Sequence, residues 1–489
     1  MKIYLENENL RKIVYDILNI FYDKKDFSFV EENGDISIKN GLITTKDKSY
    51  FFDSNLKLKE ILFEILKDES KKSSPWGILT GSKPSKLLKN HSLEDLKNIY
   101  KVSDEKINLL KNIKESQDRL NFNPKSFNLY INIPFCPQRC KYCSYPTIVS
   151  KAVDKNQYVD FLLKEIKGIK IDQKLDTIYL GGGTPSNLSL KDLDKILSLL
   201  NEKFTFDEFT LEAGREDTLD FEKLDLFKEK NVGRISLNPQ TFSKNVLENV
   251  NRPIDFENFI KIYEYAKDLG FIINMDFIIG LFGESRESFR KNFDILKDLN
   301  PDNITFHALA QKVGSKYFEE NINGNSNDAI KISKDIEKFT KENSYEPYYL
   351  YRQKNIIGNL ENVGYEKENT AQRYNILINE ELENIIGLGM NANSKLMNGK
   401  KYRNERNLRD YYKNIEKEIS DKNKLIENFK PWYKAQSVDN PSGTNIGLQK
   451  LLISKFQNSK NANSLTLKQC VFWRILKFEI KSIFFVWYS

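Results

Sequence analysis

Three of the chain's four cysteines lie together in residues 128–146, which read NLYINIPFCPQRCKYCSYP. Three residues separate Cys136 from Cys140, and two separate Cys140 from Cys143. Three thiolates at this spacing can hold one face of a small inorganic centre and leave one coordination position free. Structural zinc prefers four closed ligands, often in paired CxxC knuckles. The pattern therefore favours an iron–sulfur cluster with one open iron, with zinc and buried free cysteines as the alternatives.

A glycine-rich turn, GGGTP at 181–185, follows the second apolar run of this region. Glycines let a backbone approach a ligand closely and present N–H groups to a carboxylate or carbonyl oxygen. A strand-to-helix turn can also need glycine for steric reasons alone. Both interpretations remain open from the sequence.

Polar residues recur at the ends of the later apolar runs. These residues are Glu212, Arg215, Asn238, Gln240, Arg252 and Asp276. Each alone can be a helix cap, a turn residue or a solvated charge. Their repetition at one end of successive strands is typical of a barrel active site. Glu212 and Asp276 interrupt apolar runs, so a buried carboxylate at either position needs a polar or charged partner.

Six strand-like runs alternate with helical segments from residue 127 onward. The predicted strands are 129–133, 177–180, 208–212, 234–237, 272–278 and 303–308, and the predicted helices are 155–170, 190–203, 221–230, 256–269 and 284–299. This alternation predicts parallel βα units in an α/β fold. Right-handed crossovers favour a partial (β/α)6 barrel. The cysteines follow the first strand, at the barrel end that carries chemistry.

Four domains are expected along the chain. An accessory α+β domain covers 1–125, the barrel core 126–314, a C-terminal α/β extension that covers a substrate 315–428, and an atypical tail 429–489. In the accessory domain, 10–22 and 57–67 are predicted helices, and the pairs Asn33-Gly34 and Asn40-Gly41 are predicted turns between short strands. The tail contains Cys470 and three of the four tryptophans, and we interpret it as interfacial, divergent or frame-shifted.

Composition excludes several classes of function. The 489 residues are 39% hydrophobic and 30% charged, with a net charge of +7 and no long basic block, so nucleic-acid binding has little support. The small number of cysteines argues against a disulfide framework. We see no signal peptide and no membrane span, and we expect a cytoplasmic monomer.

These motifs together resemble a known family. CxxxCxxC after an apolar strand, with Tyr142 before the last cysteine, resembles the radical S-adenosylmethionine (SAM) superfamily. The segments GGGTP, LEAGREDT, RISLNPQTF and MDFIIGL are similar to the oxygen-independent coproporphyrinogen III oxidase family. PWGILTGSKPSKL, HALAQKVGS, YLYRQKN, GNLENVGY and GLGMNANSK resemble its coproporphyrinogen dehydrogenase subgroup, the HemZ type. The resemblance covers residues 70–424.

The resemblance implies a ligand for each of these positions. Cys136, Cys140 and Cys143 would hold a 4Fe–4S cluster whose open iron binds SAM. Tyr130, Gly182 and Glu212 would contact that SAM. The family can hold a second SAM, and the positions expected around it are Gly183, Thr184, Gln240, Arg252 and Asp276, with Ala308 as a backbone contact.

The resemblance also implies a reaction. The cluster, reduced by a donor such as flavodoxin or ferredoxin, would cleave SAM to a 5′-deoxyadenosyl radical. The radical would take hydrogen from a propionate of coproporphyrinogen III, and loss of CO2 and one electron would leave a vinyl group. Two such steps give protoporphyrinogen IX. Candidate propionate-binding residues are Lys83, Lys86, Lys312 and Arg352, although each can also be a solvated charge.

Two positions differ from the oxidase pattern. Tyr145 stands where well-characterised oxidases have a further cysteine, and Asn132 stands where they have histidine. Related sequences include a haem chaperone that keeps the cluster motif. The alternatives are therefore a haem chaperone without oxidase activity, a radical SAM enzyme with another substrate, and a zinc-stabilised barrel.

Overall fold

The computed structural model describes residues 1–22, 25–72, 74–81, 83–149 and 153–429. All of them belong to one compact unit, Met1–Trp432. The expected tail at 429–489, with Cys470, lies outside the described residues except for Phe429.

The N-terminal segment has its own sheet and its own hydrophobic core. Its five strands have the order β2-β1-β3-β4-β5. The elements are β1 (Lys2–Leu5), η1 (Glu8–Leu10), α1 (Arg11–Phe21), β2 (Ser28–Val30), β3 (Ile36–Lys39), β4 (Leu42–Thr44), β5 (Ser49–Phe51) and α2 (Asn55–Ser70). Asn40 and Gly41 have φ values of 50° and 75°, as a tight hairpin between β3 and β4 requires, so this predicted turn is confirmed. The sequence did not predict β1.

Three helices lead from this segment to the barrel: α3 (Pro84–Leu87), α4 (Leu93–Asn98) and α5 (Asp104–Asp118). Ser92 and Ser103 cap the last two, accepting hydrogen bonds from the amides of Asp95 and Lys106. The sequence interpretation predicted neither α4 nor α5, although both serines are recognisable N-cap signals.

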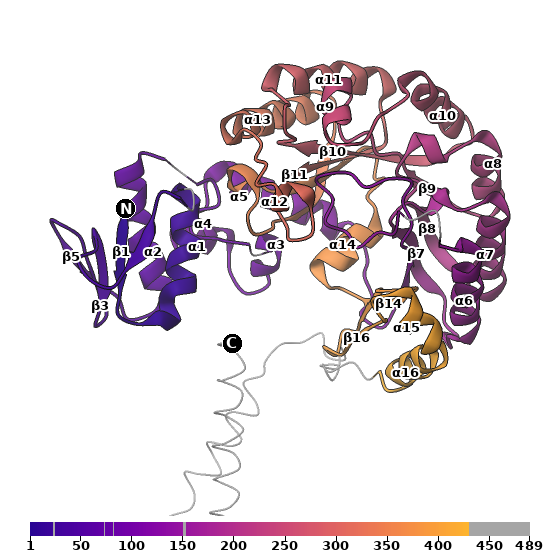
Figure 1. Ribbon diagram of the computed structural model, residues 1–489, viewed down its shortest axis with the longest axis horizontal. Helices are drawn as coiled ribbons and strands as arrows, with labels where there is room; N and C mark the ends of the chain where they lie inside the picture. Colours follow the sequence, from indigo (N-terminus) through magenta and orange to yellow (C-terminus); the bar gives the residue numbers. More distant parts are fainter. Residues whose placement is uncertain (23–24, 73, 82, 150–152, 430–489) are drawn as a thin grey trace, which may run out of the picture. The chain divides into compact units, whose positions relative to one another are not determined.

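The predicted barrel is present, with helices on its outer side (Figure 1). Its strands are β6 (Phe127–Ile133), β7 (Leu175–Gly182), β8 (Phe206–Leu211), β9 (Arg234–Ser236), β10 (Ile272–Ile279) and β11 (Asn303–Ala308), each paired in parallel with the next. The helices between them are α6 (Lys155–Gly168), α7 (Leu190–Lys203), α8 (Phe221–Glu229), α10 (Phe256–Asp268) and α11 (Arg286–Leu299). The short elements η2 (Pro185–Asn187), η3 (Glu216–Thr218) and α9 (Lys244–Asn249) lie in loops.

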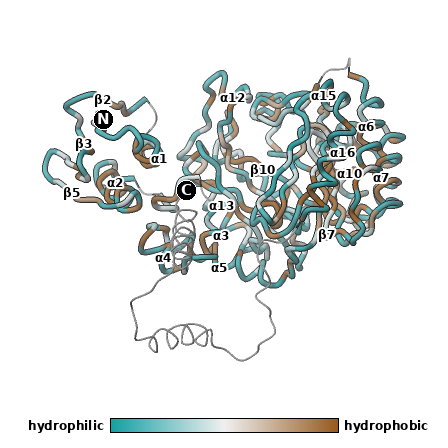
Figure 2. The backbone as a smooth tube through the Cα atoms, turned by 90° about the horizontal axis from the view of Figure 1, so that it is seen from below, coloured by the Kyte–Doolittle hydropathy of each residue, from teal (hydrophilic) through white to brown (hydrophobic). Residues whose placement is uncertain are grey.

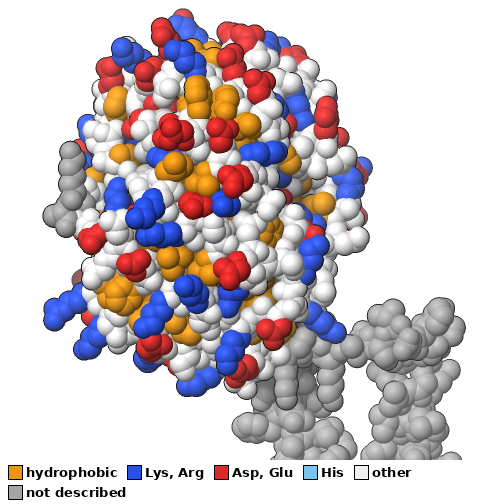
Figure 3. All heavy atoms as spheres, turned by 90° about the vertical axis from the view of Figure 1, so that its right-hand side faces the viewer, with side chains coloured by type: hydrophobic (Ala, Val, Ile, Leu, Met, Phe, Trp, Pro, Cys, Tyr) orange, Lys and Arg blue, Asp and Glu red, His pale blue; other side chains and the backbone are white. Residues whose placement is uncertain are grey.

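The barrel strands bury one face against the helices. Leu129, Ile178, Leu211 and Ile273 are fully buried in one large hydrophobic cluster that includes residues of α6, α7, α8, α10 and α11. In Figure 2 the backbone of α7 and α10 changes between teal and brown, as expected for helices with one apolar face. The outer faces in Figure 3 carry interspersed basic and acidic side chains. Because side chains alternate along a strand, the residues between these apolar ones point into the barrel.

The C-terminal extension adds strands to both edges of the barrel sheet. Its strand order is β12-β13-β11-β10-β9-β8-β7-β6-β14-β15-β16. The added elements are α12 (Lys316–Glu319), α13 (Ser326–Glu342), β12 (Glu346–Tyr351), η4 (Ile357–Asn359), β13 (Asn362–Glu366), α14 (Arg373–Glu380), β14 (Asn384–Leu388), β15 (Asn393–Lys395), β16 (Lys401–Arg403), α15 (Leu408–Lys413) and α16 (Ile415–Glu427). Strand β14 pairs in parallel with β6, so the turn GLGMNANSK stands beside the strand that leads to the cysteines.

No helix in the described part of the chain combines the length and the hydropathy that a membrane crossing needs.

A fully buried ion pair fastens this extension to the barrel. Lys422 of α16 contacts Glu165 of α6, and neither side chain is exposed. The Glu165 carboxylate also accepts hydrogen bonds from the Gly389 amide at 2.7 Å and the Tyr411 hydroxyl at 2.6 Å. Asn404 bridges the two charges, donating to Glu165 and accepting from Lys422, each at 2.8 Å. The desolvated charges therefore have several polar partners.

Replacing Lys422 with methionine should destabilise the protein by about 3–5 kcal/mol, because Glu165 keeps a buried charge without its partner. Adding Glu165→Gln should recover much of this loss, since the neutral amide oxygen still accepts hydrogen bonds. Thermal unfolding of the two single variants and the double variant measures the coupling. If the loss of stability in the double variant equals the sum of the losses in the two single variants, the pair is not coupled.

Candidate functional site

The cysteine loop begins where β6 ends and is fastened to its neighbours by backbone hydrogen bonds. Cys136 N–H donates to the Ile148 carbonyl at 3.1 Å, and Lys141 N–H donates to the Val250 carbonyl at 3.0 Å. All three cysteines are free thiols, with Cys140 buried and the other two half-buried. Burial raises the pKa of Cys136 and Cys143, and the neighbouring cysteine sulfurs add to the rise. A metal centre would have to displace the protons of these thiols.

The surroundings of the thiols suit an anionic, thiolate-bound centre. Thr184 Oγ1 lies 3.5 Å from Cys136 Sγ, and Arg252 Nη1 lies 3.9 Å from Cys140 Sγ. Among the described residues no three His, Cys, Asp or Glu side chains are already gathered at metal-binding distance, so the loop would have to adjust on binding. Three free thiols on one loop with cationic and hydroxyl donors beside them fit a three-cysteine cluster.

Arg252 is oriented by the backbone. Its Nη2 donates to the carbonyls of Gly214 at 2.7 Å and Asn238 at 2.6 Å. Burial opposes its charge, but Tyr142 and Cys140 outweigh this effect and raise the Arg252 pKa. Arg252 thus keeps a positive charge beside Cys140.

The glycine turn after β7 lies against the start of the cysteine loop. Gly183 N–H donates to Ile133 at 2.7 Å, and Thr184 N–H donates to Phe135 at 2.8 Å. Gly182 has a φ of 115°, and a Cβ there would stand 2.0 Å from Asn132 Oδ1. A Cβ at Gly183 would stand 2.6 Å from the Phe135 carbonyl. These glycines therefore meet a steric requirement of the protein backbone, whether or not they also contact a ligand.

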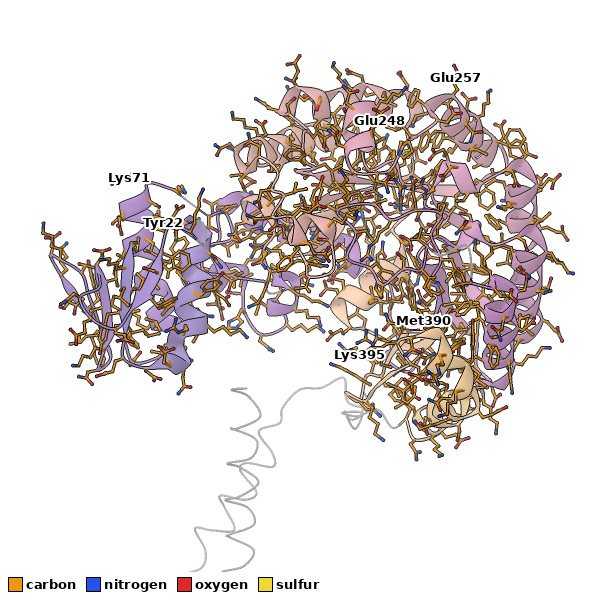
Figure 4. The ribbon with its side chains drawn as sticks, in the orientation of Figure 1. Tyr22, Lys71, Glu248, Glu257, Met390 and Lys395 are labelled. Atoms are coloured by element: carbon orange, nitrogen blue, oxygen red, sulfur yellow. The ribbon has the colours of Figure 1, made fainter. Side chains whose placement is uncertain are left out.

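A hydrogen-bonded group of three residues stands beside this turn. The hydroxyls of Tyr130 and Tyr145 lie 2.8 Å apart, and they lie 3.3 Å and 3.0 Å from Asn132 Oδ1. With one proton each, one hydroxyl can donate to the other while the second donates to Asn132 Oδ1. Asn132 Nδ2 donates to the Met390 carbonyl at 2.6 Å. Figure 4 shows Met390 on the C-terminal segment beside the barrel. The two positions that differ from the oxidase pattern, Asn132 and Tyr145, are therefore in direct contact.

Tyrosine rings fill the barrel interior next to this group. Tyr179 stacks on Tyr374 with ring centroids 4.4 Å apart, and Tyr130 stacks on both at 6.1 Å and 6.2 Å. The sequence interpretation missed Tyr179 and Tyr374. Tyr179 is two residues before the glycine turn and so on the interior face, a signal that strand alternation could have supplied. Tyr374 comes from α14, and nothing local predicts its position.

Two carboxylates, Glu212 and Asp276, and the imidazole of His307 come from the end of β8, from β10 and from β11, and Glu212 also lies beside the glycine turn. His307 Nε2 lies 3.6 Å from Asp276 Oδ1, and its Nδ1 lies 3.1 Å from the Tyr351 hydroxyl. Asn274 Nδ2 donates to Asp276 at 2.8 Å. Burial raises the pKa of Glu212 to about 7, and the charge of Asp276 adds to the rise. Glu212 therefore titrates near neutral pH, which is common for functional carboxylates.

The two remaining predicted contacts also lie at strand ends. Gln240, with a φ of 67°, exchanges backbone hydrogen bonds of 2.9 Å with Asp276 and Ile278. Ala308 ends β11 beside His307 and is buried. The predicted cofactor residues thus belong to one end of the barrel sheet, and their ligand contacts remain predictions.

Three of the four candidate propionate-binding residues are engaged elsewhere. Lys83 and Lys86 form ion pairs with Glu381, and Lys83 also donates to the Asn379 carbonyl at 2.8 Å. Arg352 is buried and donates to the carbonyl oxygens of Leu79, Asn359 and Leu360. Lys312 forms no ion pair within the described residues. Burial lowers the Lys312 pKa, and the nearby Cys143 opposes that shift.

A parallel barrel with three thiols on the first βα loop defines the class of the radical SAM enzymes. The Radical SAM superfamily profile matches residues 130–296. An oxygen-independent coproporphyrinogen-III oxidase-like protein, HemZ, of Bacillus subtilis is 31% identical over 86% of this chain and 97% of its own length. The chain belongs to the radical SAM superfamily and, within it, to the oxygen-independent coproporphyrinogen III oxidase-like family.

Other relatives carry two kinds of name. A haem chaperone, HemW, of Buchnera aphidicola is 25% identical over 64% of this chain and 82% of its own length. An oxygen-independent coproporphyrinogen III oxidase of Salmonella typhimurium is 31% identical over 38% of this chain. The solved coproporphyrinogen III oxidase of Escherichia coli superposes with a TM-score of 0.51 at 22% identity, covering 61% of this chain and 71% of that chain. This likeness confirms the predicted fold.

The stability of the apoprotein should fall as pH rises through about 7, because Glu212 must lose its proton in a buried site. The pKa of Glu212 is about 7 in the folded protein and near 4.5 in the unfolded chain. Its contribution to stability is therefore complete below pH 4.5 and is lost as pH rises through the folded pKa. Glu212→Gln should remove this dependence, worth up to about 3 kcal/mol. Melting temperatures of both proteins between pH 5 and 8 test it. Parallel pH curves would contradict the assignment.

Proposed function

We propose that this protein is a radical SAM enzyme of haem biosynthesis that decarboxylates two propionates of coproporphyrinogen III without oxygen and gives protoporphyrinogen IX. The observation that carries the proposal is the match to the oxidase-like HemZ protein, which extends over 97% of that relative. The three free thiols on one loop and the polar strand ends support the same reaction class.

The residues have distinct roles under this proposal. Cys136, Cys140 and Cys143 would hold a 4Fe–4S cluster, and SAM bound with it would supply the radical that takes hydrogen from the substrate. Tyr130, fixed by Asn132 and Tyr145, and Gly182 border the first SAM. Glu212 offers a carboxylate to its ammonium group, which favours the ionised form and therefore tighter binding above about pH 7.

The tyrosine stack and the buried strand ends keep water out of the barrel interior, as radical chemistry requires. Gly183, Thr184, Gln240, Arg252, Asp276 and Ala308 surround a second SAM in this proposal. Lys312, an exposed lysine near Cys143, is the residue that we assign to a substrate carboxylate. The ionised form of that carboxylate is the one that releases CO2.

A haem-chaperone role is the rival proposal, and relatives with that name support it. An axial ligand would be needed, and His307 is the imidazole at the site. Its Nδ1 is engaged with Tyr351 at 3.1 Å and its Nε2 faces Asp276. Binding iron would require His307 to leave one of these partners, which favours the enzyme.

Anaerobic incubation of reconstituted protein with SAM, dithionite, coproporphyrinogen III and a one-electron acceptor, which takes the electron that each decarboxylation releases, should yield 5′-deoxyadenosine, CO2 and protoporphyrinogen IX. Cys140→Ala should abolish all three, because the cluster loses a ligand. Lys312→Met should raise KM for the porphyrinogen about tenfold while leaving substrate-free SAM cleavage unchanged, since a lost charged hydrogen bond is worth about 1.5–3 kcal/mol.

Product analysis by chromatography distinguishes the two roles. Cleavage of SAM without a vinyl product, together with stoichiometric haem binding that His307→Ala removes, would favour the chaperone. A colourless zinc protein after reconstitution would exclude both.

A further inference from the structure

The outer side of the cysteine loop carries exposed basic and apolar side chains. Arg139 lies between Cys136 and Cys140 and is exposed, and Lys141 is half-exposed. The neighbouring segment contributes exposed Lys316, with Val313 at 78% and Phe318 at 43% of their possible exposure. We call Arg139, Lys141, Val313, Lys316 and Phe318 the cluster-loop surface.

Direct hydrogen bonds join the two segments into one surface. Arg139 Nη2 donates to the Gly314 carbonyl at 2.6 Å, and Tyr317 N–H donates to the Lys141 carbonyl at 3.1 Å. Buried Tyr317 anchors α12, because its hydroxyl accepts from the Phe282 amide at 3.1 Å. The exposed side chains therefore stand on a backbone that is fixed to the loop bearing the thiols.

The charges of this surface are unpaired. Other basic residues form ion pairs, such as Arg286 with Asp335 and Lys267 with Asp302. Arg139, Lys141 and Lys316 form none with any residue that the structure describes. The acidic neighbours are Glu319 and Glu320, which follow Phe318. An apolar centre with unpaired cations around it fits a partner whose surface is acidic around an apolar patch.

We propose that the cluster-loop surface docks an acidic one-electron carrier protein of the flavodoxin or ferredoxin class. The inference rests on the proposed function, because a cluster held by the three thiols must gain one electron before SAM is cleaved. In the docked pair the reduced carrier loses one electron and the oxidised cluster gains it, with no bond or proton transferred. The surface lies directly over the loop that bears the cysteines, so docking there keeps the electron path short.

The test variant combines Lys316→Glu and Val313→Asp, which lie outside the cysteine motif. With reduced flavodoxin, SAM cleavage by this variant should be at least about tenfold slower than in the parent, since electrostatic steering changes association rates by such factors. Cleavage driven by dithionite should be unchanged. Two control variants each reverse one charge. Lys334→Glu on α13, outside the cluster-loop surface, should behave as the parent, and Glu319→Lys, next to that surface, should match or exceed the parent.

A second readout does not depend on catalysis. Titration calorimetry of flavodoxin into the full-length protein measures the Kd of the complex. The Kd should be about tenfold weaker for the double variant than for the parent. For the parent, it should also weaken about tenfold when salt rises from low to physiological concentration. If the double variant binds flavodoxin as tightly as the parent and cleaves SAM with reduced flavodoxin as fast as the parent, the proposed docking site is wrong. Loss of dithionite-driven cleavage in the parent, with flavodoxin binding intact, would instead contradict the proposed function.

Discussion

The buried pair of Glu165 and Lys422 is the interaction on which the site's geometry depends. It holds the turn after β14, because Gly389 N–H donates to Glu165. The same turn holds Asn132 by two sets of hydrogen bonds. The Tyr158 hydroxyl donates to the Asn132 carbonyl and accepts from the Met390 amide, and the Asn132 side chain donates to the Met390 carbonyl. A charge pair in the C-terminal extension thus sets the end of β6, four residues before the first cysteine.

This arrangement explains why the extension belongs with the barrel rather than beside it. Strand β14 pairs with β6, and β13 pairs with β11, so both edges of the six-stranded barrel sheet are covered. Open parallel edges would expose unpaired backbone groups. Strand β12, which pairs with β13, brings Tyr351 to His307. The segment that covers the sheet edges therefore also supplies residues to the site.

The sequence predicted the barrel well because its signals are local. Apolar runs such as Leu129–Ile133 mark strands buried against helices, and the polar residues at their ends mark one face of a parallel sheet. It could not predict contacts between distant segments. Tyr374 reaches Tyr179 from α14, and Lys422 reaches Glu165 from α16, and no periodicity encodes such pairs. The sequence interpretation missed the short strand β14, because its residues NIIGL lead into a glycine-rich turn and its pairing with β6 cannot be seen in the sequence.

The two sides of the interior differ in how they respond to protons. On the β6 side, Asn132 has no titratable group and burial raises the pKa of Tyr145, so this hydrogen-bonded group keeps its protons across the physiological range. On the β8 and β10 side, Glu212 changes charge near pH 7 beside Asp276. Asn132 and Tyr145, which differ from the oxidase pattern, therefore place no group that titrates near neutral pH on this side of the site. Proton-dependent behaviour near neutral pH is left to Glu212, which faces the positive groups of SAM in the proposed complex.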